Sequence, residues 1–123
     1  MNPIRIKRIY EPSSVEDGYR ILVDRLWPRG ISKERARIDE WAKMISPSTE
    51  LRKEFNHERS MMEDFKKKYI MELDHNEHAV EFVNRMIEKL EHDHVTLLFA
   101  AKNEKINHAI ILKEWLDQQV NEK

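Results

Sequence analysis

The sequence predicts an α/β fold, with a small and mainly parallel sheet of three to four strands flanked by helices. Two expected strands, at residues 21–26 and 95–101, carry this prediction because each contains an apolar run without alternation. Such runs are typical of strands buried on both faces of a parallel sheet. Amphipathic stretches between and after them supply the helices that would cover the sheet. The length suits one hydrophobic core, so we expect a single domain over residues 1–123.

The first third of the chain predicts two strands joined by a loop. Ile4 and Ile6 alternate with charged residues, which indicates a half-exposed or edge strand. Residues 11–18 are rich in turn formers and predict a loop with one helical turn. A second strand is expected over residues 19–26. A short helix follows over residues 32–37, with a serine at its N-cap.

The middle of the chain leaves one segment ambiguous. Residues 38–45 fit either the spacing of a helix or one face of a strand. We favour a short strand because Ser46 and Pro47 already suit the cap and first position of the next helix. That helix would bury Leu51 and Phe55, which are four residues apart.

Three amphipathic helices and one strand complete the chain. Helices are expected over residues 60–73 and 77–90, then the strand at 95–101, and a C-terminal helix from His108. The expected buried stripes are Met62, Phe65, Tyr69 and Leu73 in the first helix, Val80, Val83, Ile87 and Leu90 in the second, and His108, Ile111, Leu112 and Trp115 in the last.

Composition excludes several classes of protein. The chain has no cysteine, so disulfides and thiolate chemistry are excluded. Its first residues lack the apolar core of a signal peptide, and its longest apolar run is too short to cross a bilayer. We therefore expect a cytoplasmic protein with no membrane partner. Residues 1–37 carry a net charge of +4 and the remainder −5, which favours an anion near the first third but argues against a nucleic-acid binder.

The end of the second expected strand is the strongest candidate site. Asp24 and Arg25 lead into a Trp27–Pro28 turn that carries Arg29. A type I turn would aim Arg29 back toward Arg25, and two guanidinium groups together would clamp a phosphate or carboxylate. We expect Arg25, Arg29 and Trp27 to contact the ligand. The alternative is that Arg25 pairs with a buried carboxylate and Arg29 is solvated.

Two further segments could contribute to the same site. Ser48 and Thr49 open a helix, with Arg52 one turn further on, and free amides at a helix start attract anions. Ordinary helix capping explains the same residues and is the commoner reason for a serine at this position, so we favour it. Asn107 and His108 follow the last strand, and parallel strands would bring them to the same sheet edge as Arg25. There the helix dipole favours a neutral imidazole, which could exchange a proton with a ligand. The alternative is that His108 only packs.

We assign His108 and Asp24 as the catalytic residues of this site if a reaction occurs. Ligand-binding residues would be Arg25, Trp27, Arg29, Ser48, Thr49, Arg52 and Asn107. We expect no metal and no cofactor. Four other histidines lie in two clusters, at residues 75–78 and 92–94, without cysteine and without a His-Glu-x-x-His motif, so these clusters predict solvated surface rather than a zinc site.

With these residues in place, the chain resembles the YeaO-like family of small uncharacterised bacterial proteins (domain of unknown function 488). The resemblance covers nearly the whole chain and is carried by residues 18–30, 46–52, 97–103 and 107–109. Family members often have alanine where this chain has Ser46. The resemblance implies a compact cytoplasmic α/β protein and brings no assigned reaction with it.

Three functions therefore compete. The first is a pocket for a small anionic ligand, such as a nucleotide or another phosphorylated metabolite, with or without catalysis. The second is a nucleic-acid-associated module that stacks bases on Trp27 and uses Arg5, Lys7, Arg8, Arg20 and Arg29. The third is a non-catalytic protein-interaction protein, with Trp27 and Trp115 at its interface.

Overall fold

The computed structural model describes residues 2–55 and 61–122, and its centre is a parallel four-stranded sheet. The strands are β1 (Ile4–Arg8), β2 (Tyr19–Leu22), β3 (Glu40–Trp41) and β4 (Val95–Phe99). Their order is β1-β4-β2-β3, and every pair of neighbours is parallel. The predicted α/β class is confirmed, β2 and β4 are the two inner strands, and β1 lies at an edge.

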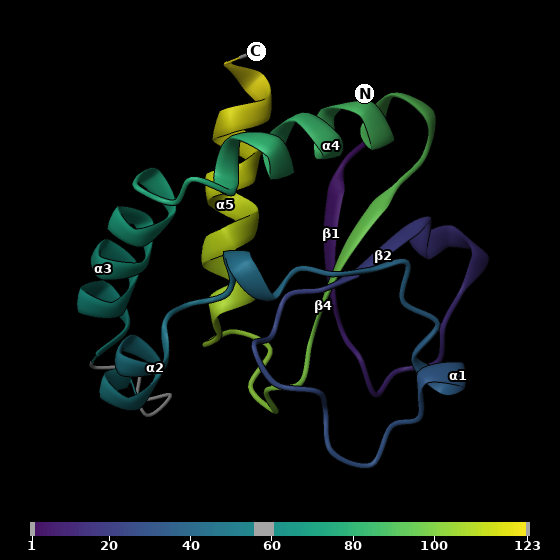
Figure 1. The fold of residues 1–123 in the computed structure, drawn as a ribbon. Helices are drawn as coiled ribbons and strands as arrows, with labels where there is room; N and C mark the ends of the chain where they lie inside the picture. The colour runs from purple at the N-terminus through teal and green to yellow at the C-terminus, as the bar shows by residue number, and fades with distance from the viewer. Residues whose placement is uncertain (1, 56–60, 123) are drawn as a thin grey trace.

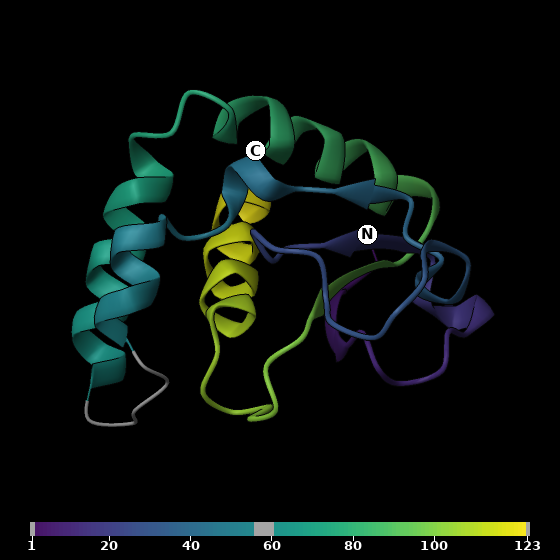
Figure 2. The same cartoon turned by 60° about the horizontal axis from the view of Figure 1, so that its bottom comes forward.

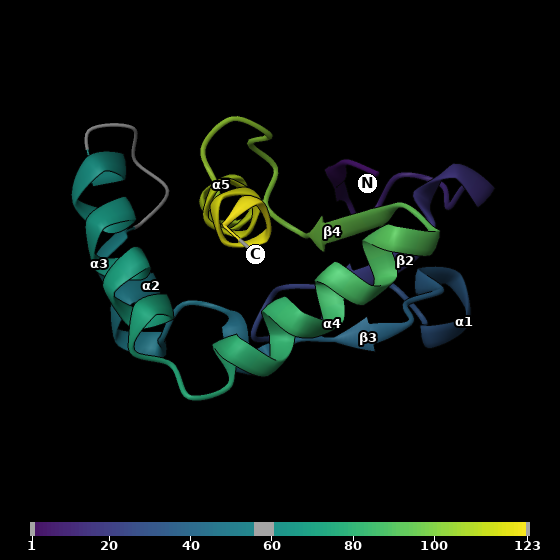
Figure 3. The same cartoon turned by 90° about the horizontal axis from the view of Figure 1, so that it is seen from above.

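In the described part of the chain, five α-helices lie around the sheet, and most of them lie on one side of it. They are α1 (Lys33–Ala36), α2 (Thr49–Phe55), α3 (Met62–Asp74), α4 (Ala79–His92) and α5 (His108–Asn121). Figures 1 and 3 show α5 between the strands on one side and the α2–α3 pair on the other. Helix α1 and the loops near it lie on the other side of the sheet from α5. The larger apolar core therefore forms between the sheet and α3, α4 and α5.

Strand β2 ends at Leu22, four residues before the predicted end. Val23 still donates its N–H to Leu98 O at 3.0 Å, but Asp24 leaves the strand pairing. The Asp24 carboxylate accepts the N–H of Ala100 at 3.0 Å, and its carbonyl accepts the indole N–H of Trp41 at 2.7 Å. These bonds replace the ladder and turn the chain away from the sheet.

The ambiguous segment after α1 forms a strand, as favoured, but only over β3. A 3-10 turn at Lys43–Ile45 follows it directly. Glu40 anchors this short strand, since it accepts from the Tyr19 hydroxyl at 2.9 Å and from Arg85 of α4 at 2.8 Å. Burial and the bond to Glu40 raise the pKa of Tyr19 to about 12.

The predicted start of the next helix is wrong by two residues. Helix α2 begins at Thr49, and Ser48 rather than Ser46 accepts an N–H from inside it, that of Leu51 at 3.2 Å. The Ser46 hydroxyl instead donates to Lys43 O at 2.6 Å and belongs to the preceding turn.

Helix α4 presents a different face from the one predicted. Val80 is 62% exposed, whereas Ala79, Phe82 and Met86 are buried together with the expected Val83 and Leu90. The helix runs over Ala79–His92 rather than over 77–90. Its buried stripe also lies on a different face from the predicted one. The stripes of α3 and α5 are confirmed at Phe65, Tyr69, Leu73, Ile111, Leu112 and Trp115. The predicted first residue of the third helix, residue 60, lies outside the described residues.

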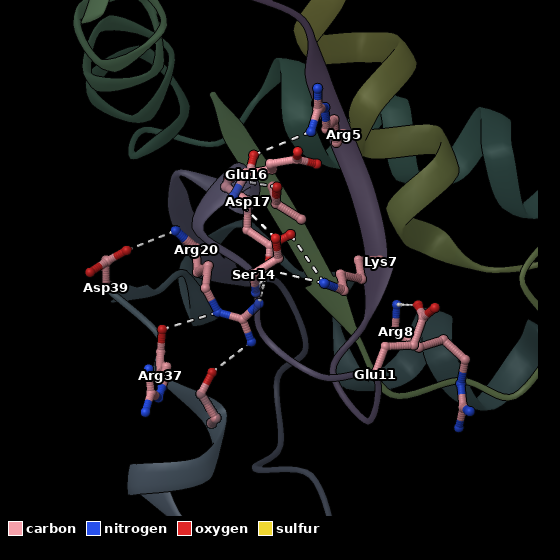
Figure 4. Close-up of polar contacts among 12 residues, drawn as sticks. Arg5, Lys7, Arg8, Glu11, Ser14, Glu16, Asp17, Arg20, Arg37 and Asp39 are labelled. Carbon is pink, nitrogen blue, oxygen red and sulfur yellow. Dashed lines mark hydrogen bonds and ion pairs between the residues drawn. The ribbon is translucent and has the colours of Figure 1, made fainter. Parts of the chain in front are cut away.

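A buried ionic cluster is formed by Lys7, Asp17 and Arg20 (Figure 4). It lies on the second face of the sheet, which is the face on the side of α1. The Asp17 carboxylate accepts from Lys7 Nζ at 3.1 Å, from the Ser14 N–H at 3.0 Å and from the Arg20 guanidinium. Arg20 also donates to the carbonyls of Ala36 and Arg37, at 2.7 and 3.1 Å. Burial acts to raise the pKa of Asp17, but these three donors together hold that pKa below its ordinary value.

Candidate functional site

A cleft of about 720 Å³ lies at the carboxyl end of the sheet. Such ends are where open α/β sheets place their ligands, and the volume is within the range of small-molecule sites. Figure 2 turns this end of the molecule forward and shows the loops after β2 and β4 there. The cleft is lined by Tyr10, Asp24, Arg25, Leu26, Trp27, Pro28, Arg29, Pro47, Thr49, Arg52, Lys53, Phe55, Phe65, Ala100, Ala101, Lys102 and His108.

Seven of the nine residues assigned from the sequence therefore lie around one cleft. They come from three separate segments, namely the loop after β2, the start of α2, and the start of α5. The parallel arrangement of β2 and β4 is what brings the first and last of these segments together. The seven residues are Asp24, Arg25, Trp27, Arg29, Thr49, Arg52 and His108.

Ser48 and Asn107 do not line this cleft, contrary to the sequence-based assignment. The Ser48 hydroxyl donates to Glu72 at 2.6 Å and caps α2. Asn107 is fully buried as the N-cap of α5, where its side-chain oxygen accepts the Ile110 N–H at 3.2 Å. Its amide group donates to Asn103 O at 2.9 Å. Capping therefore occupies the polar side chains of both residues.

Arg25 spans the floor of the cleft. Its Nε donates to Pro47 O at 3.1 Å and one terminal nitrogen donates to Ser46 O at 3.2 Å. The guanidinium thus joins the loop after β2 to the segment before α2. This differs from the alternative of a carboxylate partner. Because a guanidinium has five N–H donors, others remain for a ligand.

The turn that carries Arg29 is held from two sides by aromatic side chains. The Tyr10 hydroxyl donates to Arg29 O, and the Trp27 indole N–H donates to Ile31 O, each at 2.7 Å. Trp27 also packs edge-on against Trp41, with ring centroids 5.3 Å apart. Gly30 has a φ of 80°, a conformation that favours glycine. The turn is therefore fixed before any ligand arrives.

Asp24 and His108 meet beneath the cleft. His108 Nε2 lies 3.0 Å from Asp24 Oδ1 and 3.0 Å from Val23 O. The hydrogen bond of the His108 ring is made with the Val23 carbonyl. Asp24 Oδ1 therefore lies within ion-pair distance of the ring, but it accepts no hydrogen bond from the described part of the chain. Both side chains are 14% exposed. This contact ties the start of α5 to the end of β2.

Tyr69 of α3 supports the same region from within the core. Its hydroxyl donates to Ile45 O at 2.6 Å, and its ring packs against the imidazole of His108. Complete burial, with the nearby Glu72 and Asp24, raises the pKa of Tyr69 well above its ordinary value. Tyr69 is therefore a neutral donor that fixes the turn before α2.

The charges around the cleft are strongly unbalanced. Among the residues that the structure describes, its lining has five Arg and Lys side chains and only one carboxylate, that of Asp24. Within residues 2–55 and 61–122, no carboxylate lies within ion-pair distance of any of the five. Such an arrangement concentrates positive potential in the cleft. The five are Arg25, Arg29, Arg52, Lys53 and Lys102.

Sequence reasoning missed several residues of this lining. Tyr10 and Lys102 come two and three residues after the ends of β1 and β4. The expected parallel sheet was therefore a signal that could have placed both residues at this edge. Lys53 has no comparable signal, because nothing in the sequence separates it from other exposed helix lysines. Phe55 was expected in the core, and its neighbour Phe65 stacks on it with centroids 4.1 Å apart.

The residues required by the two competing functions are mostly engaged elsewhere. Arg20 is 4% exposed and cannot contact a nucleic acid, and Lys7 is paired with Asp17. Trp115 is 6% exposed and donates to Asp74 at 3.0 Å, so it cannot form an interface. Arg20 and Trp115 are therefore too buried for the roles that the two alternatives give them, and the alternatives themselves stay predictions. No helix in the described part of the chain is both long and apolar enough to span a bilayer.

Comparisons with known proteins give a family and no reaction. Residues 3–123 match a family described as the inactive DUF488-N3 subclade. An uncharacterised protein of Escherichia coli named YeaO is 47% identical over 113 residues, covering 92% of this chain and 96% of that protein. An uncharacterised protein of Mycobacterium tuberculosis is 33% identical over 114 residues, covering 93% of each chain. No solved structure matches this chain.

Proposed function

Because this chain belongs to the YeaO-like DUF488 family, in a subclade described as inactive, we propose that it binds a small anionic ligand without chemical turnover. The ligand carries phosphate or carboxylate groups and occupies the cleft at the carboxyl end of the sheet. One observation carries this proposal: among the described residues, five cationic side chains line a single cleft to which Asp24 contributes the only carboxylate.

The cationic residues would have two different roles in binding. Arg29, Arg52, Lys53 and Lys102 are exposed at the rim, where they attract an anion from solution. Arg25 is half-buried and already held by two carbonyls, so it offers its remaining donors at a fixed position. Guanidinium groups suit this role because they bind phosphate and carboxylate oxygens in pairs.

Asp24 and His108 have a structural role in this proposal. Their polar atoms contact the Ala100 N–H, the Val23 carbonyl and each other. The same pair could in principle transfer a proton. The catalytic assignment of both residues stays a prediction, and the description of the subclade as inactive favours the structural role.

Calorimetric titration with inorganic phosphate at low salt tests the proposal. We expect saturable binding that weakens as salt is added, because rim charges are screened. The double variant Arg29→Gln/Arg52→Gln should bind phosphate about tenfold more weakly, since it loses charge-assisted contacts.

The matched control is Arg35→Gln, which removes an exposed arginine of α1 outside the cleft. This control should bind phosphate as the unaltered protein does. Equal affinity of the double variant and the control, or no binding by the unaltered protein, would show that the cleft is not an anion site.

A further inference from the structure

We propose that the natural ligand of the cleft is a nucleotide with at least two phosphates, whose planar base packs against Tyr10 and Trp27. This inference rests on the proposed anion-binding function and narrows it to one class of ligand. Three features of the cleft support it: its size, its fixed aromatic rings, and its excess of positive charge.

The size of the cleft exceeds what a simple anion needs. Its volume of about 720 Å³ lies well inside the range of pockets that enclose whole organic ligands. A lone phosphate or carboxylate would leave most of that space to water. A ligand with a sugar and a base would fill it.

Two of the aromatic rings in the lining are held in place before binding. The polar atoms of Tyr10 and Trp27 are both bonded to one turn, at Arg29 O and Ile31 O. Both rings also rest on the same small core, which includes Leu22, Ile31 and Leu98. Rings that are already ordered lose little conformational entropy on binding. Any of the bases could stack on them, because every base has a flat aromatic face.

The charge of the cleft favours several phosphates over one. A single phosphate or carboxylate would neutralise only part of the five cationic groups that the described residues contribute alongside one carboxylate. The rim charges come from three segments, at Arg29, at Arg52 and Lys53, and at Lys102. A chain of two or more phosphates can reach more than one of these segments at once.

A mononucleotide fits these features better than a nucleic-acid strand does. The chain has a net charge of −1 and lacks the overall basic character typical of nucleic-acid binders. Arg20 and Lys7, which a longer binding track would need, are held by Asp17.

Calorimetry with ADP, pyrophosphate and adenosine on the full chain separates the parts of this proposal. We expect ADP to bind at least tenfold more tightly than pyrophosphate, because stacking adds to the phosphate contacts. Adenosine should bind more weakly than either. Equal affinity for ADP and pyrophosphate would overturn the inference while the anion site stands. No binding of either, or adenosine as tight as ADP, would overturn the anion site as well.

Variants of the aromatic rings then test where the base lies. Trp27→Leu should weaken ADP binding far more than pyrophosphate binding, so that the affinities for the two ligands become similar. Tyr10→Phe, which keeps the ring, should retain most ADP affinity, whereas Tyr10→Leu should not. An unchanged ADP affinity in folded Trp27→Leu would overturn the inference.

A second measurement needs no variant that could fail to fold. In ¹⁵N spectra of the unaltered protein, the Trp27 indole signal should shift with ADP and shift far less with pyrophosphate. The buried Trp115 indole, bonded to Asp74, is the internal reference and should stay in place. An unmoved Trp27 signal at ADP saturation would overturn the placement of the base.

Discussion

Single residues in this protein connect segments that are far apart in the sequence. Asp24 contacts β4 through Ala100, β3 through Trp41 and α5 through His108. Asp17 does the same on the second face, where it joins β1, the 3-10 turn at Val15–Asp17 and β2. Asp24 makes these contacts through both its carboxylate and its backbone carbonyl, whereas Asp17 makes them through its carboxylate, whose effect on stability can be tested.

Asp17→Asn should be less stable than the unaltered protein at neutral pH, by about 3 kcal/mol, because it leaves Lys7 and Arg20 without their anion. The folded state lowers the pKa of Asp17, so the ionised carboxylate stabilises the fold above its unfolded pKa of about 3.9. That stability is lost as the pH falls through the lower, folded pKa. Urea denaturation across pH 2–7 measures both effects.

The neighbouring exposed residue supplies the control for Asp17. Glu16→Gln should change stability by less than about 0.5 kcal/mol. The Asp17→Asn variant should also show a shallower loss of stability on acidification. Identical acid profiles for Asp17→Asn and the unaltered protein would contradict a structural role for the ionised carboxylate.

At the scale of elements, the close approach of β2 to the turn before β4 depends on one glycine. Gly18 has a φ of 66°, and a Cβ built on it would lie 2.2 Å from the backbone oxygen of His94. That oxygen accepts the N–H of Tyr19 at 2.9 Å and so begins the register between the two strands. A side chain at Gly18 would push these strands apart.

Gly18→Ala should therefore destabilise the protein by at least about 3 kcal/mol, through backbone strain together with the clash. Gly30→Ala is the matched control, because Gly30 also has a positive φ but has open space around it. It should lose only about 1–2 kcal/mol from strain. Chemical denaturation compares the two, and equal losses would show that the approach to His94 can relax.

The sequence predicted an element well where its residue pattern was compatible with only one structure. The unalternating runs in β2 and β4 had no explanation other than burial on both faces, and both strands are inner and parallel. Val80 was misplaced because the apolar residues of α4 fit more than one stripe, and the stripe that contains Ala79, Phe82 and Met86 is the buried one. Ser48 and Asn107 cap helices and do not line the cleft, and the sequence could not separate the two roles because a capping residue and an anion-binding residue have the same sequence signature. The carbonyl partners of Arg25 depend on a tertiary approach that no local pattern encodes.

At the scale of the whole molecule, the cleft joins parts of unequal stability. Its floor is attached to β2 and β4, which are buried in the sheet, whereas one wall is the seven-residue α2. Figures 1 and 3 show α2 and α3 on the far side of α5 from the strands. Short elements with little burial open locally before the core unfolds.

Amide hydrogen exchange should therefore be at least about tenfold faster in α2 than in β4. Saturating ADP should slow exchange in α2, which carries Arg52 and Lys53, and leave β4 unchanged. Helix α4, which lines no part of the cleft, is the internal control. Protection of α4 and α2 to the same degree would indicate a global effect of the ligand rather than binding at the cleft.

The strand order has a consequence for the synthesis of the chain. Strand β4 is the last of the four to emerge from the ribosome, yet it lies between β1 and β2. Until residues 95–99 have been translated, β1 has no neighbour, and β2 can pair only with the short β3. Until then, the backbone N–H and C=O groups of these strands remain unpaired in the nascent chain, and unpaired strand edges promote aggregation. Arg5, Lys7 and Arg8 place three positive charges on β1, and charge of this kind discourages pairing with other chains during that interval.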